Sequence, residues 1–376
     1  MPIYKMDGKK DGKQKYRVRI NYTDSLGNAK QIDRIAYGSA EAKLLEQELT
    51  RQIKHETPAQ RLTVNALYIK YLEAKKAEVR ETTFVKSQTA IEHHILPYLA
   101  DVKIEKLTAP VLQEWKQAIE ALDLSIRTRK NIYSEFRTML NWAVKMDYLP
   151  KNPLLKVGNF KAPLEIKKEM DYYTPEEFRK FINVAKESAI KAEKNGDTTQ
   201  WHYYVFFAIA FYTGLRKGEI HALQWTDIKD GYLYVTKSLT QKLKGGDKIT
   251  PPKNKSSIRT LQLPQPLINI LNEHHTRCAQ LNGFREDYKI CGGTRALRDT
   301  TIQNANERFA KAAGIKTIRI HDFRHSHASV LANEGINIQE ISRRLGHSDI
   351  SMTLQTYSHL YPREEERAIN ILNKIV

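Results

Sequence analysis

The apolar residues of this 376-residue chain change their spacing along the sequence, and these changes limit the folds that the chain can adopt. Near the N-terminus, the stretch KQKYRVRI alternates residue by residue, which places Tyr16, Val18 and Ile20 on one face of a strand. From residue 61 to about residue 160, the apolar residues recur at the spacing of an α-helix. After residue 170, helical and alternating stretches are mixed. We therefore expect a multidomain protein with three differently built parts.

The first expected domain, residues 1–57, is a small β-sheet plus a helix. A turn at Gly27 separates two strands, and the helix presents an apolar stripe that includes Leu44 and Leu49. The other face of the first strand carries four cations. A strand that is basic on one face and apolar on the other suits a core behind it and phosphate in front. We interpret the domain as DNA-binding, with an ordinary solvated sheet as the alternative. The four cations are Lys13, Lys15, Arg17 and Arg19.

The second expected domain, residues 61–160, is all helical. Four stretches show helical periodicity, and Thr63, Thr82, Thr108 and Ser125 are available as N-caps at their starts. Three cations open the last helix. Positive charge there opposes the helix dipole, so a bound phosphate would relieve an unfavourable local interaction. These cations are Arg127, Arg129 and Lys130.

The third expected domain, residues 171–376, is mixed and mainly α-helical, with a small antiparallel sheet. Its first helix is capped by Thr174. An apolar helix then ends in a Thr-Gly turn, after which Arg216 stands at the start of another helix, beside backbone donors suited to an anion. Three alternating stretches between residues 231 and 264 predict the sheet, with Lys253 and Lys255 at its sharpest turn. The basic segment that precedes this domain lacks helical periodicity and is interpreted as an extended linker.

The composition narrows the class of partner. The formal charge of +18 and the isoelectric point near 9.6 favour a polyanion, because basic surfaces bind nucleic acid with release of its counterions. A basic protein without such a partner is the alternative. The two cysteines support neither a disulfide framework nor a cysteine-based zinc module. No signal peptide and no apolar run of about 18 residues is present, so we expect a cytoplasmic protein without a membrane partner.

Residues 321–357 carry an unusual density of arginine and histidine, closed by Tyr357. Arginine grips phosphate oxygens in pairs, histidine exchanges protons near neutral pH, and a tyrosine hydroxyl can act as a nucleophile. This set suits a phosphodiester. The alternative is a zinc site built from the four histidines, but no cysteine or carboxylate completes the ligand set and the arginines would repel the ion. We therefore expect no metal and no cofactor, and we interpret His325 and His327 as packing or supporting residues.

Four motifs together resemble one family. TGLRKGE, PPKNKSSIRTL, HDFRHSHAS and LGHSDISMTLQTY follow the order found in the tyrosine recombinases, and more closely in the integrases of phages and conjugative transposons. His347 precedes Tyr357 by ten positions, as is usual in that family. The resemblance covers about residues 170 to 360. The two preceding domains are similar in kind to the family's arm-binding and core-binding domains.

The resemblance implies a role for each motif. Arg216 and Arg324 would clamp the phosphate, His347 would donate to a phosphate oxygen, and Tyr357 would attack to form a 3′-phosphotyrosyl intermediate. His321 would exchange the tyrosine proton. A hairpin lysine would protonate the departing 5′ hydroxyl; we favour Lys253, with Lys255 as the alternative.

The resemblance also implies partners. These are double-stranded DNA at core and arm sites, a homo-oligomer such as a tetrameric synapse, and accessory proteins that bend DNA or set direction. A site-specific recombinase is the leading interpretation. A relaxing type IB topoisomerase and a catalytically idle DNA-binding regulator are the alternatives. The tail after residue 362 carries an apolar stripe at helical spacing, which would dock either on its own domain or on a neighbouring protomer.

Overall fold

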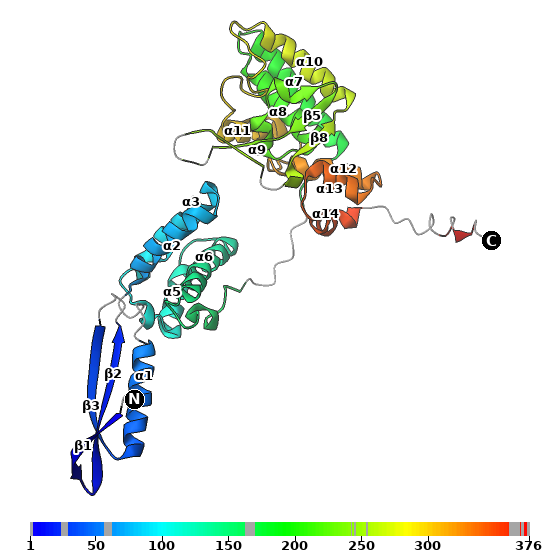
Figure 1. The fold of residues 1–376 in the computed structure, drawn as a ribbon. Coiled ribbons are helices and arrows are strands. Elements are labelled where there is room, and N and C mark those ends of the chain that lie inside the picture. Colours follow the sequence, from blue (N-terminus) through cyan, green and yellow to red (C-terminus); the bar gives the residue numbers. More distant parts are fainter. Residues whose placement is uncertain are drawn as a thin grey trace. The chain divides into compact units, whose positions relative to one another are not determined.

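The computed structural model of the protein divides into two compact units, residues 1–166 and residues 167–376 (Figure 1). None of the described helices is both long and apolar enough to cross a membrane. The structure describes residues 3–23, 29–55, 62–161, 170–241, 243, 246–252 and 255–360, together with positions 369, 372 and 373.

The first unit begins with a three-stranded antiparallel sheet in the order β1-β2-β3, followed by one helix. Val18 and Ala36 of the sheet are buried against Ala42 and Leu49 of the helix, so the predicted alternation is confirmed. The first strand was not expected from the sequence. Leu44 is 66% exposed, so its predicted inward position is wrong: a stripe through Ala42 and Leu49 turns Leu44 outward. The elements are β1 (Ile3–Lys10), β2 (Lys13–Thr23), β3 (Ala29–Tyr37) and α1 (Ser39–His55).

The rest of the first unit is helical, as expected. Trp115 and Phe136 are buried in its core and meet edge to face, with ring centroids 5.0 Å apart. Thr63 and Ser125 accept hydrogen bonds from backbone amides at the starts of their helices. The helix expected to start at Thr82 begins two residues earlier, after Arg80. The elements are α2 (Val64–Glu78), α3 (Glu81–His94), α4 (Leu96–Leu99), η2 (Ile104–Lys106), α5 (Ala109–Glu120), α6 (Ile126–Lys145) and η3 (Pro153–Lys156).

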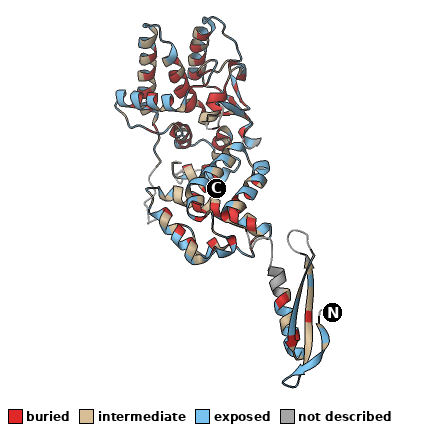
Figure 2. Cartoon of the chain, turned by 90° about the vertical axis from the view of Figure 1, so that its left-hand side faces the viewer, coloured by how far each residue is buried: buried red, intermediate tan, exposed pale blue. Residues whose placement is uncertain are grey.

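The core of the second unit surrounds helix α8 (Thr199–Thr213), which is apolar on nearly all sides and is therefore buried (Figure 2). Phe207 of α8 packs against Phe181, Phe309 and Phe323, which come from three other helices. Thr174 forms the predicted cap of the first helix in a reciprocal pair with Glu177. The other long helices are α7 (Pro175–Glu193), α10 (Gln265–Ala279), α11 (Asp299–Ala312) and α12 (Asp322–Asn333).

Two small sheets stand where the sequence predicted one. Within the described residues, the stretch expected to be the middle strand of a single sheet pairs with residues 238–240, and the strand that follows it pairs with residues 232–235 instead. The first sheet has the order β4-β5-β8, from β4 (Ile228–Lys229), β5 (Tyr232–Val235) and β8 (Arg259–Gln262). The second consists of β6 (Ser238–Thr240) and β7 (Lys248–Thr250).

Short helices complete the second unit. Most of the expected apolar tail helix lies outside the described residues; of its stripe, Ile369 and Leu372 are described, and both are exposed. The short helices are α9 (Lys217–Ala222), η4 (Trp225–Asp227), η5 (Lys255–Ser257), α13 (Ile338–Leu345), α14 (Ile350–Tyr357) and η6 (Ser358–Leu360).

Candidate active site

Two glycine carbonyls hold the two arginines that the sequence singled out. Arg324, on the first turn of α12, donates from Nη1 to the Gly214 carbonyl oxygen at 2.9 Å. Arg216, at the start of α9, donates from Nη2 to the Gly346 carbonyl oxygen at 3.2 Å. Each arginine is thus tied to a different motif, so the stretches around residues 214, 324 and 346 form one site.

Both glycines are required by their surroundings. Gly214 has φ +64°, and a Cβ at this position would lie 2.7 Å from Cδ2 of His327. Gly346 has φ +66°, and a Cβ there would lie 3.0 Å from Nη1 of Arg259. Left-handed backbone and close contact both disfavour a side chain at these positions. The carbonyls that hold the arginines therefore depend on glycine.

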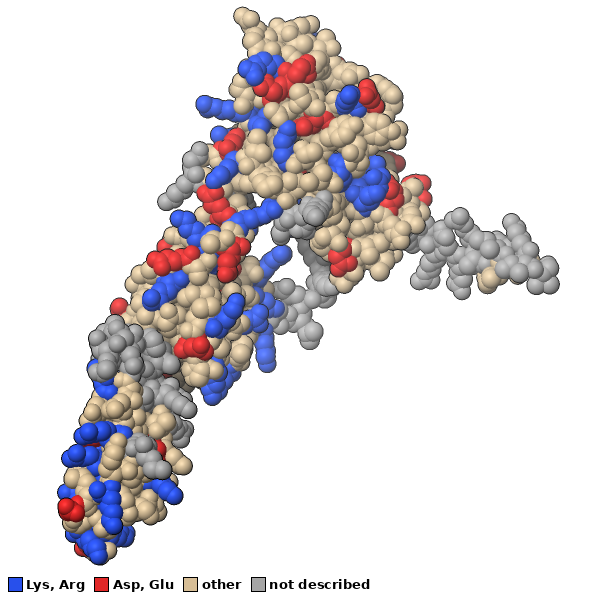
Figure 3. All heavy atoms as spheres, viewed as in Figure 1, with Lys and Arg blue, Asp and Glu red and all other residues tan. Residues whose placement is uncertain are grey.

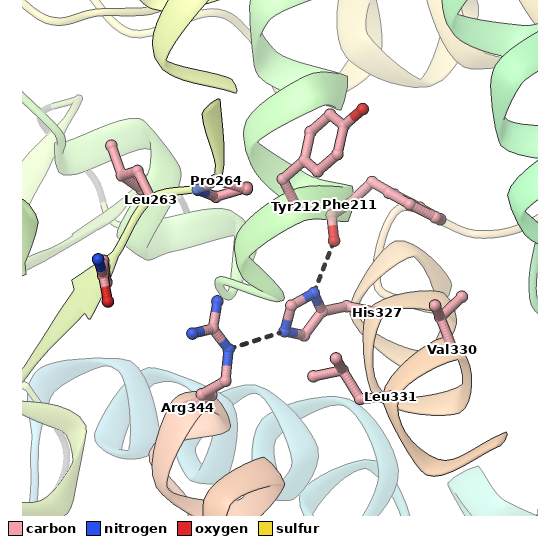
Figure 4. A pocket seen from close by; sticks show the side chains of 9 residues that line it. Phe211, Tyr212, Leu263, Pro264, His327, Val330, Leu331 and Arg344 are labelled. Atoms are coloured by element: carbon pink, nitrogen blue, oxygen red, sulfur yellow. Dashed lines mark hydrogen bonds between the residues drawn. The ribbon is translucent and has the colours of Figure 1, made fainter. Parts of the chain in front are cut away.

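His327 packs next to Gly214 and fixes its ring with two hydrogen bonds (Figure 4). Its Nδ1 donates to the Phe211 carbonyl oxygen at 2.8 Å, and its Nε2 lies 3.5 Å from Nε of Arg344, which donates to it. Burial lowers the pKa of His327 to about 3, and the charge of Arg344 adds to this effect, so the ring is neutral. His327 is a packing residue, as interpreted from the sequence.

A buried carboxylate orients Arg216. Glu219 accepts from Nη1 of Arg216 at 3.0 Å and from Nη2 of Arg259 at 2.9 Å. Burial by itself would raise the pKa of Glu219, but the Arg259 hydrogen bond and the neighbouring positive charges more than offset it, so the pKa is lowered. Glu219 therefore stays ionised between two guanidinium groups.

Neither Glu219 nor Arg259 was expected from the sequence to belong to the site. The alternation of β8 could have predicted the position of Arg259, because Arg259 lies on the same strand face as the buried Leu261. A cation at an inward strand position needs a buried anion. The sequence predicted that backbone donors at the start of helix α9 would suit an anion. Because α9 spans only six residues, the Arg216 guanidinium supplies the anion-binding group instead.

Arg324 has an unused donor. The residue is 3% exposed, and its Nη2 has no hydrogen-bond partner among the described residues. Burial lowers the pKa of Arg324 to about 9, and Arg216 lowers it further, yet the group remains charged near neutral pH. A buried, charged donor without a partner is costly. This atom is therefore the strongest structural indication that an anion completes the site.

His347 lies beside the arginines, on the turn between α13 and α14. Its Nδ1 is 2.7 Å from Oγ1 of Thr353, which fixes the ring. Burial lowers the pKa of His347 to about 4, and the charges of Arg324 and Arg216 act in the same direction. A bound anion would reduce that positive field and favour a proton on this ring.

Tyr357 ends α14 and is 1% exposed. Its hydroxyl lies 2.6 Å from Nδ1 of His325. Burial raises the pKa of Tyr357 above its usual range, against the opposing effect of Arg324. The partner expected from the sequence, His321, is exposed and makes no hydrogen bond to Tyr357 in the described part of the chain. The structure thus brings Tyr357 together with the histidine that the sequence analysis had set aside.

The side chain of neither hairpin lysine is among the described residues. Lys253 lies outside the described residues, and Lys255 belongs to η5 with an undescribed side chain. Among the described residues, no group of three or more histidine, cysteine or carboxylate side chains is arranged to hold a metal ion.

The cations expected to bind DNA in the first unit are not equally available. Lys13 is exposed, and Lys15 and Arg17 are partly exposed, whereas Arg19 pairs with Asp33 at 2.9 Å. Figure 3 shows lysine and arginine gathered over the N-terminal sheet. On α6, Arg127 is exposed and Lys130 is half-buried, but Arg129 donates to the Leu122 carbonyl oxygen at 2.9 Å. Their contribution to DNA binding stays a prediction.

Two family models match the chain. The phage integrase N-terminal SAM-like domain matches residues 63–119, and the phage integrase family matches residues 172–364. The second match spans just over half of the chain and includes every residue of the arginine, histidine and tyrosine cluster. The chain belongs to the phage integrase family. Members of this family include tyrosine recombinases, which break and rejoin DNA at defined sites, so the reaction class inferred from the sequence is confirmed.

Relatives of this integrase match it along nearly its whole length. The ICEBs1 integrase of Bacillus subtilis is 28% identical, over 97% of this chain and 98% of its own. A XerC-like tyrosine recombinase of Caldanaerobacter subterraneus is 29% identical, over 97% of both chains.

Solved integrase structures share the fold. The Tn1549 transposon integrase, in complex with a circular intermediate DNA, has a TM-score of 0.66 at 19% identity and covers 84% of this chain and 100% of its own. A lambda integrase dimer bound to a COC′ core site has a TM-score of 0.57 at 19% identity, over 94% of both chains.

Proposed function

We propose that this integrase cuts DNA with Tyr357 and holds the cut strand as a 3′-phosphotyrosyl intermediate. The observation that carries the proposal is the Nη2 atom of buried Arg324, which has no hydrogen-bond partner in the described part of the chain and lies close enough to Arg216 and Tyr357 to interact with them electrostatically. A phosphodiester supplies the anion that this donor lacks. Its non-bridging oxygens suit two guanidinium groups, whose charge stabilises the transition state in a preformed site.

The reaction follows from the side chains. The Tyr357 oxygen bonds to phosphorus, the bond from phosphorus to the 5′ oxygen breaks, and a hairpin lysine gives that oxygen a proton. His347 donates to a non-bridging oxygen once the phosphate raises its proton affinity. The phosphotyrosyl bond keeps the energy of the broken phosphodiester, so a hydroxyl of another strand can reverse the step without a metal or nucleotide.

A pocket of about 800 Å³ lies beside His347 and extends the site. Its walls come from the β5 and β8 strands and from α13, and they are rich in hydroxyl, amide and guanidinium groups, which suit a sugar-phosphate backbone. The lining residues are Tyr234, Thr236, Ser256, Ile258, Arg259, Thr260, Gln339, Ser342, Arg343, Gly346, His347 and Ile350.

The domain roles are part of the same proposal. Residues 1–57 bind arm-type DNA, residues 61–160 bind the core site, and residues 171–376 carry the chemistry. The lambda integrase has been solved as a tetramer bound to a Holliday junction, which supports a tetrameric synapse for this fold. The other partners are accessory proteins that bend DNA or set direction, and the place of action is the cytoplasm.

Deletion of residues 1–57 should preserve cleavage of a short core-site duplex but lower recombination between full-length ends. The physical reason is that the sheet carrying the basic face of β2 has its own hydrophobic core, so its removal should not disturb the catalytic domain. A point variant sharpens the test: Arg17→Gln should weaken arm-site binding, whereas Lys43→Gln, on the exposed face of α1, should not. Footprints that are unchanged by the deletion contradict an arm-binding role.

The affinity of the intact protein for DNA should also fall by about 10³ to 10⁵ as salt rises from about 50 to about 200 mM.

The two hairpin lysines can be separated by a change of leaving group. Lys253→Ala should slow cleavage of ordinary DNA by about 10² to 10⁴. A 5′-bridging sulfur needs no proton to depart, so it should restore the rate of this variant. Lys255→Ala is the matched control, and rescue of that variant instead assigns the proton to Lys255.

A plasmid that carries two target sites tests the proposed function against its alternatives. A recombinase converts the plasmid into deletion or inversion products in which the two sites have exchanged their flanking DNA. Relaxation of supercoils without such products indicates a topoisomerase. Binding with neither outcome indicates an idle regulator. The proposal expects recombinants that depend on both sites.

A further inference from the structure

The proton of Tyr357 has a recipient that the expected roles do not include. His325 Nδ1 lies 2.6 Å from the tyrosine oxygen, a short hydrogen bond even for a hydroxyl donor. The two rings are tilted by 51° with their centroids 5.8 Å apart, so they meet through these polar atoms rather than by stacking. We propose that His325 takes the Tyr357 proton during strand cleavage and returns it during rejoining. This inference rests on the proposed function, because it takes Tyr357 as the nucleophile.

His321 is less well placed for that role. Its ring meets the His325 ring edge to face at 5.1 Å and perpendicular to it. It makes no hydrogen bond to Tyr357 within the described residues. His321 therefore contacts His325 rather than Tyr357, and it is assigned the role of a positioning residue.

The protonation states fit a proton that moves from tyrosine to histidine. Burial lowers the pKa of His325 to about 4, and the nearby His321 adds to this effect, so Nδ1 is free to accept near neutral pH. Burial keeps the proton on Tyr357. The charged and titratable groups that face His325 are His321, Asp322, Arg324 and Arg319 from α12 and the segment before it, and His347 and Tyr357 from the α13–α14 region.

Bound DNA changes this balance in the required direction. A phosphate between the arginines reduces the positive field that Arg324 exerts on His325, which raises the affinity of Nδ1 for a proton. In the balanced step, the bond between Oη and hydrogen breaks as the bond between Oη and phosphorus forms. The proton passes to Nδ1, and the departing 5′ oxygen takes a different proton from the hairpin lysine. Rejoining reverses each transfer.

Substitution of His325 by asparagine separates proton transfer from positioning. The asparagine Oδ1 can accept a hydrogen bond near the place of Nδ1, but it is not a base at neutral pH. His325→Asn should therefore keep Tyr357 in place and still lower single-turnover cleavage of a nicked substrate by about 10² to 10⁴. His325→Ala should lose both functions, and added imidazole should restore part of its rate. His321→Asn is the matched control and should lose less.

The pH profile is the deciding measurement. Burial lowers the pKa of His325 to about 4 in the free protein, so Nδ1 is unprotonated near neutral pH, and wild-type cleavage should rise by much less than about tenfold per pH unit between about pH 7 and about pH 9. In His325→Asn, hydroxide must take the proton, so the rate should rise about tenfold per pH unit. A level profile in His325→Asn, or the rising profile in His321→Asn instead, overturns the inference.

Controls separate this inference from the proposed function. An adduct in Tyr357→Phe contradicts the nucleophile itself. Loss of the adduct in Tyr357→Phe, together with a wild-type rate and profile in His325→Asn, contradicts only the role of His325. Thermal unfolding and native-gel binding of each variant show whether it is folded, and His325→Asn carries the test if His325→Ala is not.

Discussion

Arg324→Met is expected to lower strand cleavage by at least about 10² to 10³, the cost of removing a preorganised donor from a developing negative charge. Arg324 supplies a buried Nη2 that has no hydrogen-bond partner among the residues the structure describes, so its loss removes the contact expected with bound phosphate. Arg216 cannot replace it, because Glu219 and the Gly346 carbonyl fix the direction of that guanidinium.

The same substitution should not destabilise the free protein. Removal of a buried charge that lies near Arg216 and Arg259 relieves desolvation and repulsion, which offsets the loss of the bond to Gly214. Single-turnover cleavage and thermal unfolding, measured on one preparation, check both statements. Arg179→Met, on the exposed surface of α7, removes the same charge elsewhere and should affect neither. Unchanged cleavage by Arg324→Met contradicts the phosphate clamp.

Residues in local motifs could be predicted well from the sequence. The cap at Thr174 and the alternation of Tyr16, Val18 and Ile20 depend on neighbours a few positions away, and the structure has both. The joining of Arg216 and Arg324 in one site was implied by the resemblance. Its structural basis, a glycine carbonyl under each guanidinium, is visible only in the fold.

The identity of the tyrosine's partner could not be predicted from the sequence. His321 and His325 are four positions apart at the start of α12, so helical geometry places both on nearly the same side. Which of them meets Tyr357 depends on how α14 packs on α12, and buried residues from several elements, among them Ala328 and Leu345, decide that packing. The pairing of Glu219 with Arg259 is equally nonlocal, since it joins α9 to β8.

Strand pairing failed for a related reason. Alternation showed that residues 231–264 contain strands, but it does not say which strands pair. Tyr232 and its neighbours in β5 pair with β8, across a gap in which β6 and β7 form their own sheet. Leu44 shows the limit of helical periodicity. Leu44 and Leu45 fit the apolar stripe almost equally well from the sequence, and only packing against the sheet shows that Leu44 is the exposed one.

Tyr357→Phe should abolish the covalent protein–DNA adduct while leaving core-site binding intact. The substitution removes only the nucleophilic oxygen, and the phenylalanine ring can still pack in the hydrophobic cluster that includes Ala328 and Leu345. Loss of the bond to His325 should not unfold the site, because the histidine is only partly buried and can bind water instead. Tyr232→Phe, at an exposed position on β5, is the matched control and should form adduct normally.

The most direct measurement uses a nicked core-site duplex, whose short 5′ fragment diffuses away after cleavage and traps the intermediate. Wild-type protein should give a slow-migrating band on a denaturing gel, and mass spectrometry of the digested band should find DNA linked through its 3′ phosphate to the peptide that contains Tyr357. Tyr357→Phe should give the same native-gel shift and no covalent band. A covalent band from Tyr357→Phe, or DNA linked to any other residue, would contradict the assignment of Tyr357 as the nucleophile.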